Sequence, residues 1–354
     1  MKNRQVIFNL VQSNINGGLE NMYLAYSKIL AKDYEVICLV SKNFVHINEL
    51  KQQNIKYEIL NIKGHFDFFA VMKFVLLVKK YQPKLIFAHN GRCFALLNLY
   101  KFLVRKVSFK TVAVSHGGNP KRLVNFNYII TVAQHLKAKI IKKYPDINQE
   151  KIKVIYNGIS LVKITNKTQI NDKNKALTFG ILSRLSVEKN IITAIKAFAL
   201  FSKEVKNSKL VIAGEGPEEA CLKNYVLKHN LERKVVFLGH QQNIKNFFKQ
   251  IDVLVHPALE EPFGLVILEA YNYNTIVIGS NRGGLKEIIK HEYNGFLYDA
   301  PASFINLKEA MLAYHKLDDK YKRKIISNAS KSLKNNFSVE TLEKKLLLYV
   351  ATLV

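Results

Sequence analysis

Tryptophan is absent from this 354-residue sequence, and cysteine and proline are scarce. The three cysteines, Cys38, Cys93 and Cys221, lie far apart without a C-x-x-C spacing, which argues against a disulfide framework or a zinc site. No apolar run reaches the roughly 18 to 20 uncharged residues that a membrane-spanning helix needs. The first apolar run, Val6 to Val11, is too short for the core of a signal peptide, so we expect a cytoplasmic protein. We expect its cysteines to be free thiols.

Acidic residues are also few: 27 Asp and Glu stand against 54 Lys and Arg, which gives a formal net charge of +27. A surface this basic is expected to attract polyanions such as nucleic acid, anionic lipid or a phosphorylated saccharide. The apolar stretch 66–78, interrupted by Asp67 and Lys73, predicts an amphipathic helix packed on a sheet. A helix on a membrane surface is the alternative, and the mixture of apolar and basic residues over 94–110 keeps it open.

Short β-branched apolar runs alternate with longer segments of helical period, which predicts βαβ units and mostly parallel sheets. The length suits two domains, with the active site in a cleft between them. We predict a Rossmann-like domain over residues 1–163, a polar linker over 164–175, a second Rossmann-like domain over 176–335 and a C-terminal helix over 336–354. The predicted strands are 6–11, 35–40, 84–89, 111–115, 128–132 and 152–156 in the first domain, and 177–182, 209–213, 235–238, 253–256 and 275–279 in the second.

In such sheets ligands bind where strands lead into helix N-termini. The first of these loops contains Gly17 and Gly18, and paired glycines let a ligand approach the backbone closely. Neither this loop nor the segment Gly214 to Glu219 has the G-x-G-x-x-G spacing of dinucleotide-binding proteins. A nicotinamide-dependent oxidoreductase is therefore not expected.

Charged residues stand at two loops of the second domain. Arg184 follows one strand and Lys189 comes five residues later, where a guanidinium and an ammonium suit a diphosphate. Glu261 follows another strand, and Glu269 lies about 6 Å further along the helix that begins at Leu265. Two carboxylates at this spacing can bind two ends of one elongated ligand, because each accepts hydrogen bonds from vicinal hydroxyls.

The segment from Glu261 to Glu269, with Pro-Phe-Gly after the first glutamate, resembles the E-x7-E motif of retaining GT-B enzymes. Its setting, from His256 to Gly264, is similar to glycosyltransferase family 4. The resemblance extends over most of the second domain, including Asn157-Gly158-Ile159, Gly214-Glu215-Gly216-Pro217 and Gly283-Gly284. In the first domain it rests on Gly17-Gly18 and Ser115-His116-Gly117. One departure is Ser160, where the family often has Asp at a position that is usually structural.

The resemblance implies a GT-B fold, with two doubly wound Rossmann-like domains facing a cleft, and it implies a role for each matching residue. Glu261 and the backbone amides of Phe263, Gly264 and Leu265 would hold the donor sugar, and Glu269 the ribose. Arg184 and Lys189 would neutralise the diphosphate, with Gly17 and Gly18 close to it. His116 would contact the donor sugar, and Gly239 the base. No Asp-x-Asp motif is present, so fixed cations are expected to replace a metal ion.

We therefore expect a cytoplasmic, retaining, metal-independent hexosyltransferase without a cofactor, acting in bacterial surface polysaccharide or lipopolysaccharide assembly. Its expected partners are a nucleotide-sugar donor, with UDP slightly favoured over GDP, a glycan or lipid-linked acceptor, and an anionic membrane surface. Two alternatives stay open. One is another GT-B activity, either a sugar-nucleotide epimerase or a phosphorylase. The other is a non-catalytic polyanion-binding protein, although the basic residues form no stripe with interleaved aromatics of the kind that binds nucleic acid.

Overall fold

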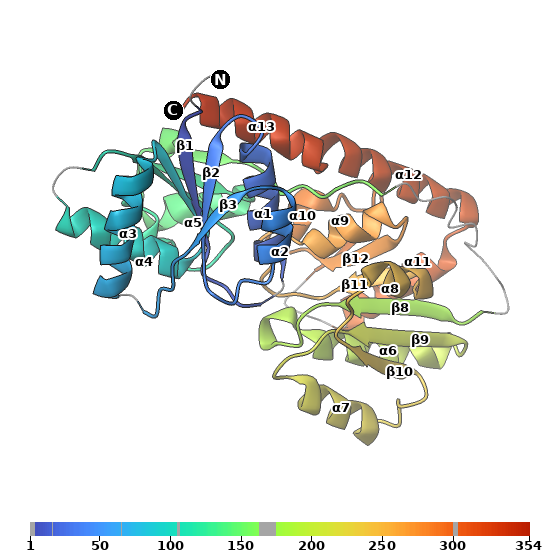
Figure 1. Ribbon diagram of the computed structural model, residues 1–354. Coiled ribbons are helices and arrows are strands. Elements are labelled where there is room, and N and C mark those ends of the chain that lie inside the picture. Colours follow the sequence, from blue (N-terminus) through green and yellow to red (C-terminus); the bar gives the residue numbers. More distant parts are fainter. Residues whose placement is uncertain (1–3, 16, 65, 105–106, 163–174, 300–303) are drawn as a thin grey trace. The chain divides into compact units, whose positions relative to one another are not determined.

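The computed structural model describes residues 4–15, 17–64, 66–104, 107–162, 175–299 and 304–354. The chain divides into two compact units (Figure 1). The first unit comprises residues 1–157 and 339–354, and the second comprises residues 158–338. Apart from Lys175, the predicted linker 164–175 lies outside the described residues.

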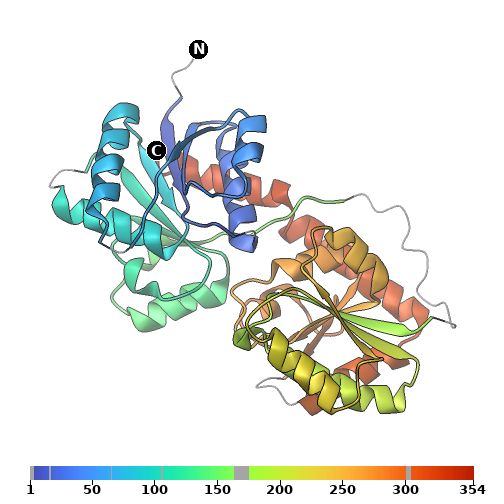
Figure 2. The same ribbon diagram turned by 60° about the horizontal axis from the view of Figure 1, so that its bottom comes forward.

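The first unit is built on a parallel seven-stranded sheet in the order β3-β2-β1-β4-β5-β6-β7. The strands are β1 (Val6–Leu10), β2 (Glu35–Val40), β3 (Lys56–Ile59), β4 (Leu85–Ala88), β5 (Lys110–Ser115), β6 (Tyr128–Thr131) and β7 (Ile152–Val154). Its α-helices are α1 (Gly18–Leu30), α2 (Ile47–Gln52), α3 (Phe68–Tyr81), α4 (Gly91–Leu103), α5 (Gln134–Lys143) and α13 (Val339–Ala351). Helices cover both faces of the sheet, so the central strands are buried on both sides (Figure 1, Figure 2).

The second unit is built on a parallel six-stranded sheet in the order β10-β9-β8-β11-β12-β13. The strands are β8 (Leu177–Leu182), β9 (Ser208–Ala213), β10 (Val235–Gly239), β11 (Val253–His256), β12 (Ile276–Ser280) and β13 (Phe296–Tyr298). Its α-helices are α6 (Ile191–Glu204), α7 (Glu219–Lys228), α8 (Ile244–Gln250), α9 (Leu265–Asn272), α10 (Leu285–Ile288), α11 (Phe304–Lys316) and α12 (Asp319–Asn336). Aromatic packing in its core uses phenylalanine, because the sequence has no tryptophan. Phe179 packs edge to face against Phe198 and Phe201, which stack on each other.

Local sequence explains where several helices begin and end. The Asp67 carboxylate accepts a hydrogen bond from the Ala70 amide at the start of α3, and the Asn90 side chain accepts one from the Cys93 amide at the start of α4. Gln82 adopts a left-handed conformation directly after α3 and stops that helix. Among the described residues, no helix is long and apolar enough to cross a membrane.

Two strands were not predicted from the sequence, and both lie at an edge of their sheet. Strand β3 is largely polar and partly exposed, and β13 has only three residues. Edge strands are buried on fewer sides, so their sequences lack the continuous apolar run that reveals a central strand.

Candidate functional site

The second unit has a topological switch point between its neighbouring strands β8 and β11. The chain leaves β8 toward β9 on one side of it and later returns to β11 on the other side. The loops after these two strands therefore diverge at the carboxyl edge of the sheet, where parallel α/β sheets bind ligands. Residues 183–190 form the loop after β8, and residues 257–264 form the loop after β11.

Hydrogen bonds fasten the two loops to each other. The Leu259 amide donates to the Glu188 carbonyl oxygen at 2.9 Å, and the Asn190 side-chain amide donates to the Pro257 carbonyl oxygen at 3.3 Å. Ser280, at the end of β12, donates to the Ala258 carbonyl oxygen at 2.5 Å. The two loops therefore form one rigid support for their side chains.

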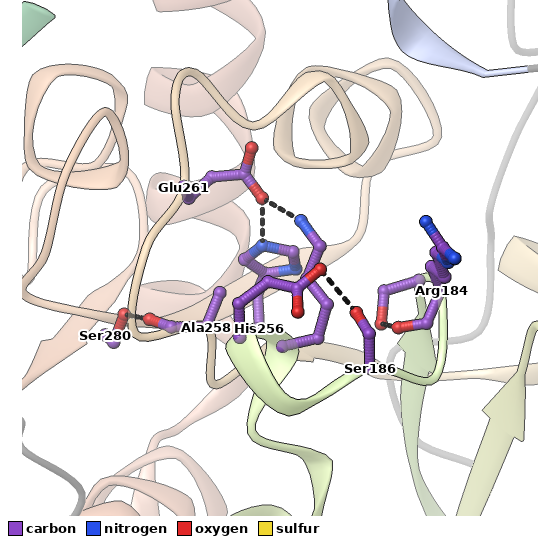
Figure 3. Close-up of polar contacts among 9 residues, drawn as sticks. Arg184, Ser186, His256, Ala258, Glu261 and Ser280 are labelled. Carbon is purple, nitrogen blue, oxygen red and sulfur yellow. Dashed lines mark hydrogen bonds and ion pairs between the residues drawn. The ribbon is translucent and has the colours of Figure 1, made fainter. Parts of the chain in front are cut away.

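This support brings together Glu261, Lys189 and His256, and Figure 3 shows the contact of Glu261 with His256. The same carboxylate oxygen of Glu261, Oε2, accepts a hydrogen bond from Lys189 Nζ at 2.7 Å and one from His256 Nε2 at 2.9 Å. The Glu261 side chain is 11% exposed and the His256 side chain 3%. Burial raises the pKa of Glu261, but the His256 hydrogen bond and the nearby Lys189 charge outweigh it and lower that pKa from 4.5 to about 2.

The arrangement leaves one oxygen of the Glu261 carboxylate available to a ligand. Both bonds go to Oε2, and no described residue donates to the other oxygen, Oε1. Oε1 can accept hydrogen bonds from ligand hydroxyls, while the Lys189 ammonium keeps two further hydrogens for a ligand anion. The group is therefore ionised at neutral pH, fixed in place and still able to bind.

The glycines around Glu261 allow the loop to pack tightly. The Gly284 amide donates to the Glu261 carbonyl oxygen at 2.8 Å, and a Cβ atom at Gly283 or Gly284 would collide with the backbone of the 261–263 loop. Gly264 has a φ of +103° and directly precedes α9. The amides of Gly264 and Leu265 thus lie at a helix N-terminus beside Glu261, while the neighbouring Phe263 is buried.

Glu269 lies on α9, about 6 Å along the helix from Leu265. Burial raises the pKa of its carboxyl group from 4.5 to about 7. Among the described residues, none forms a hydrogen bond or ion pair with this carboxylate. Glu269 is only partly exposed, and removing an unpaired carboxylate from water is costly. A bound diol would supply hydrogen bonds that no described residue provides.

Arg184 is exposed and extends on the same side of the loops as Glu261 (Figure 3). No described residue forms an ion pair with its guanidinium, which therefore remains available to an anion. Gly239, at the end of β10, has a φ of +66°, and its carbonyl oxygen accepts a hydrogen bond from the Gly214 amide at 2.8 Å. Gly239 thus lies at the same carboxyl edge of the sheet as the other predicted residues, two strands away from β8.

The first unit has its own switch point, between β1 and β4. His89, which follows β4, lies between Asn9 of β1 and His116, which follows β5. Its Nε2 is 2.8 Å from Asn9 Oδ1, and its Nδ1 is 3.1 Å from His116 Nε2. Tyr26 packs its ring edge to face against His89.

These contacts determine which ring nitrogens carry protons. Ser27 donates to the Tyr23 carbonyl oxygen at 2.9 Å, so its hydroxyl oxygen accepts from Asn9 Nδ2, also at 2.9 Å. That fixes the Asn9 amide with Oδ1 facing His89, and His89 must carry its proton on Nε2.

Burial lowers the pKa of both imidazoles, that of His116 to about 4, so both are neutral at physiological pH. The unprotonated Nδ1 of His89 therefore accepts from Nε2–H of His116. His116 is left with an unprotonated Nδ1. This side chain is partly exposed, and it presents a hydrogen-bond acceptor to a ligand hydroxyl.

Gly17 and Gly18 lie at the start of α1, the helix that follows β1. Gly17 takes the N-cap position without a capping side chain, so the first amides of the helix are open to an anion. This loop ends at the same edge of the first sheet as His116.

The structure thus joins Glu261 directly to Lys189 and places Arg184, Gly264, Leu265 and Gly239 at the same edge of the second sheet. His116, Gly17 and Gly18 belong to the first unit. His256, His89 and Asn9 were not predicted as site residues. His256 ends a strand without a distinctive spacing, and His89 and Asn9 act through residues that are distant in the chain. Among the described residues, no cluster of His, Cys, Asp or Glu could hold a metal ion.

Comparison with known proteins shows what the second unit is similar to. Residues 162–332 match the family model of glycosyl transferases group 1. An uncharacterized glycosyltransferase of Methanocaldococcus jannaschii is 33% identical over 233 residues, which cover 61% of this chain and 58% of that protein. The UDP-Gal:alpha-D-GlcNAc-diphosphoundecaprenol alpha-1,3-galactosyltransferase of Escherichia coli is 31% identical over 222 residues, 59% of this chain and 56% of that protein. The chain thus spans somewhat more than half the length of these relatives.

Solved structures extend the similarity to both units. The Anabaena protein HepE, crystallised with UDP and glucose, matches with a TM-score of 0.83 at 23% identity over 98% of this chain and 99% of its own. The lipopolysaccharide outer core galactosyltransferase WaaB matches with a TM-score of 0.75 at 17% identity over 98% of this chain and 99% of its own. The protein therefore has the two-domain GT-B fold, and its second unit matches the glycosyl transferases of group 1.

Proposed function

We propose that this protein is a retaining glycosyltransferase that moves a hexose from a nucleotide diphosphate sugar to a glycan or glycolipid. The observation that carries the proposal is the Glu261 carboxylate, held through one oxygen by Lys189 and His256 and open on the other, beside the N-terminus of α9. An ionised acceptor next to cations and helix amides matches a ligand that has sugar hydroxyls next to a diphosphate.

In the proposed complex, Oε1 of Glu261 and the amides of Gly264 and Leu265 bind the donor sugar. Glu269 accepts hydrogen bonds from the ribose diol, and Gly239 lies near the base. Gly17, Gly18 and His116 are proposed as further donor contacts from the first unit. His116 would accept a hydrogen bond from a sugar hydroxyl through its unprotonated Nδ1.

The proposed chemistry depends on charge placed in advance. Breaking the bond between the sugar and the diphosphate builds positive charge at the anomeric carbon and negative charge on the leaving phosphate. Arg184 and Lys189 would stabilise the phosphate without a metal ion. The acceptor hydroxyl would attack from the side on which the phosphate departs and would pass its proton to the departing phosphate oxygen. That geometry retains the anomeric configuration.

A UDP-sugar is the proposed donor. The structural neighbour HepE was solved with UDP and glucose, and the E. coli relative is named for UDP-Gal. Lipid-linked acceptors are proposed because that E. coli relative is named for a diphosphoundecaprenol substrate and another relative for a diacylglycerol product. Bacterial surface polysaccharide or lipopolysaccharide assembly, at the inner face of the plasma membrane, is the proposed setting.

Ligand-observed NMR with a panel of UDP- and GDP-sugars tests the donor proposal. One nucleotide sugar should bind to the wild-type protein. In the Glu261→Gln variant, the binding signals of its sugar protons should weaken more than those of its nucleotide protons. Once donor and acceptor are known, the coupling constant of the product's anomeric proton reports retention, and turnover should be unchanged by EDTA. An inverted product or strict dependence on manganese would refute the corresponding part of the proposal.

The same assay without acceptor distinguishes the alternatives. A free sugar epimer would indicate an epimerase, and a phosphate-dependent sugar product would indicate a phosphorylase. Tight, salt-sensitive binding of nucleic acid without any affinity for nucleotide sugars would instead favour a polyanion-binding protein.

A further inference from the structure

The outward face of α3 carries large apolar side chains that no described residue of the first unit covers. Phe69 is 84% exposed, Met72 66% and Leu76 66%. Phe66, two residues before the helix, is 80% exposed, and Phe68, its first residue, is 56% exposed. We call these five side chains the α3 apolar face. On a soluble surface such a group is unusual, and a contiguous exposed apolar patch marks an interaction site.

The positions follow one side of the helix. Phe69, Met72 and Leu76 are spaced three and four residues apart and therefore project in the same direction over about 10 Å. The opposite side of α3 is fully occupied, because Ala70, Val71, Phe74, Leu77 and Val78 are buried in the core of the first unit. The exposed apolar residues are thus additional to those that hold the helix on its sheet.

Positive charge accompanies the apolar face. Lys73 and Lys79 are exposed on α3, Lys63 is exposed shortly before it, and the helix contains no acidic residue. Two acidic residues nearby are already engaged. Asp67 accepts hydrogen bonds from the backbone amides of Lys63 and Ala70, and Glu58 is paired with Lys80 at 2.9 Å.

We propose that the α3 apolar face docks the first unit on an anionic lipid bilayer. Aromatic and long apolar side chains with flanking lysines are the combination that inserts into the headgroup region, since lysine stems follow the apolar surface while their ammonium groups reach lipid phosphates. A second copy of the chain is a poorer occupant, because pairing two such faces would bring the lysines of both copies together. The inference rests on the proposed function only in naming a membrane partner, and lipid binding is measurable without catalysis.

The test is cosedimentation of the full chain, without donor or acceptor, with vesicles of phosphatidylcholine alone and of phosphatidylcholine mixed with phosphatidylglycerol. The wild-type protein should bind the mixed vesicles and leave the neutral ones largely unbound. The triple variant Phe69→Ser/Met72→Ser/Leu76→Ser should lose binding by about tenfold or more. The double variant Lys73→Glu/Lys79→Glu should also lose binding to the mixed vesicles, even at low ionic strength.

A matched control removes comparably exposed leucines elsewhere. Leu227 on α7 is 56% exposed and Leu348 on α13 is 63% exposed, and Leu227→Ser/Leu348→Ser should bind vesicles like the wild type. Thermal unfolding and transfer to a water-soluble acceptor should be unchanged in the triple variant, which shows that it folds. Equal binding to both vesicle types, unchanged binding by the triple variant, or concentration-dependent dimers that this variant abolishes would each overturn the inference. Vesicle binding by a protein without transferase activity would refute the proposed function alone.

Discussion

Nδ1 of His89 lies 3.1 Å from Nε2 of His116, and this contact leaves the other nitrogen of His116 without a proton. Asn9 determines which nitrogen of His89 carries the proton, and the Asn9 amide is itself fixed by Ser27. His89 thus acts through His116 as a positioning residue. It offers the proposed donor sugar an acceptor at a defined atom rather than a mixture of two tautomers.

Replacing His89 by phenylalanine should release His116. The variant keeps a ring in the buried position but removes the acceptor for His116 Nε2–H, so both tautomers become populated. We expect kcat to fall by about tenfold. Long-range 1H–15N correlation spectra should show His116 Nδ1 unprotonated in the wild type and partly protonated in the variant.

Tyr26→Phe is the matched control for this substitution. The Tyr26 ring packs on His89, but its buried hydroxyl has no hydrogen-bond partner among the described residues. Both kcat and the His116 spectrum should therefore stay unchanged. A wild-type spectrum with the proton of His116 on Nδ1 would refute the assignment.

Glu261→Gln should reduce kcat/KM by about 10²- to 10³-fold. Glutamine keeps the shape of the side chain but removes the charge that Lys189 and His256 hold in place. Glu260→Gln removes the adjacent carboxylate and should retain nearly full activity. Equal losses in the two variants would mean that overall loop charge, and not the position of Glu261, matters.

The same carboxylate should contribute to acid stability. Its pKa in the folded protein, about 2, is below the ordinary value of 4.5. The stabilisation is therefore present above about pH 4.5 and is lost as the pH falls toward 2. Chemical denaturation over this range should show a smaller decrease in unfolding free energy for Glu261→Gln than for the wild type.

Glu269 should have the opposite effect on stability. Its pKa of about 7 in the folded protein is above the ordinary value of 4.5, so the folded state binds more protons than the unfolded state between these values. The free energy of unfolding should fall as the pH rises from about 4.5 to 7, by up to roughly 3 kcal/mol. Glu269→Gln should remove this dependence. Donor affinity should rise severalfold from pH 6 to 8 in the wild type, and calorimetric titrations with the variant should show no such rise.

Gly264→Ala should destabilise the protein by about 1 to 3 kcal/mol. Its φ of +103° is unfavourable for alanine, and the new Cβ would lie 2.9 Å from a Leu285 methyl group. Gly64→Ala is the control, because nothing lies within 4 Å of a Cβ there. Thermal unfolding measures both effects, and similar melting temperatures for the two variants would contradict the argument.

The sequence predicts the central strands well because a parallel strand that is buried on both sides needs a continuous apolar run. Strands β2 and β8 were predicted with their observed bounds, and α9 begins at Leu265 as expected. Pairing of side chains across loops was beyond prediction. Lys189 and Glu261 are 72 residues apart, and Asn9 and His89 are 80 apart. Only the fold determines that these side chains meet, and His256, a buried residue at the end of a strand, had no distinctive spacing.

Helix α13 returns the chain to the first unit, with consequences for biosynthesis. Lys32 is paired with Glu343 at 2.6 Å, and Lys110 donates to the Leu353 carbonyl oxygen at 2.9 Å. A ribosome completes residues 1–157 early, but these contacts can form only after the whole second unit has been synthesised. The first unit therefore lacks helix α13 while the second unit is synthesised. Premature termination before residue 339 would leave the first unit, which is synthesised first, without this helix.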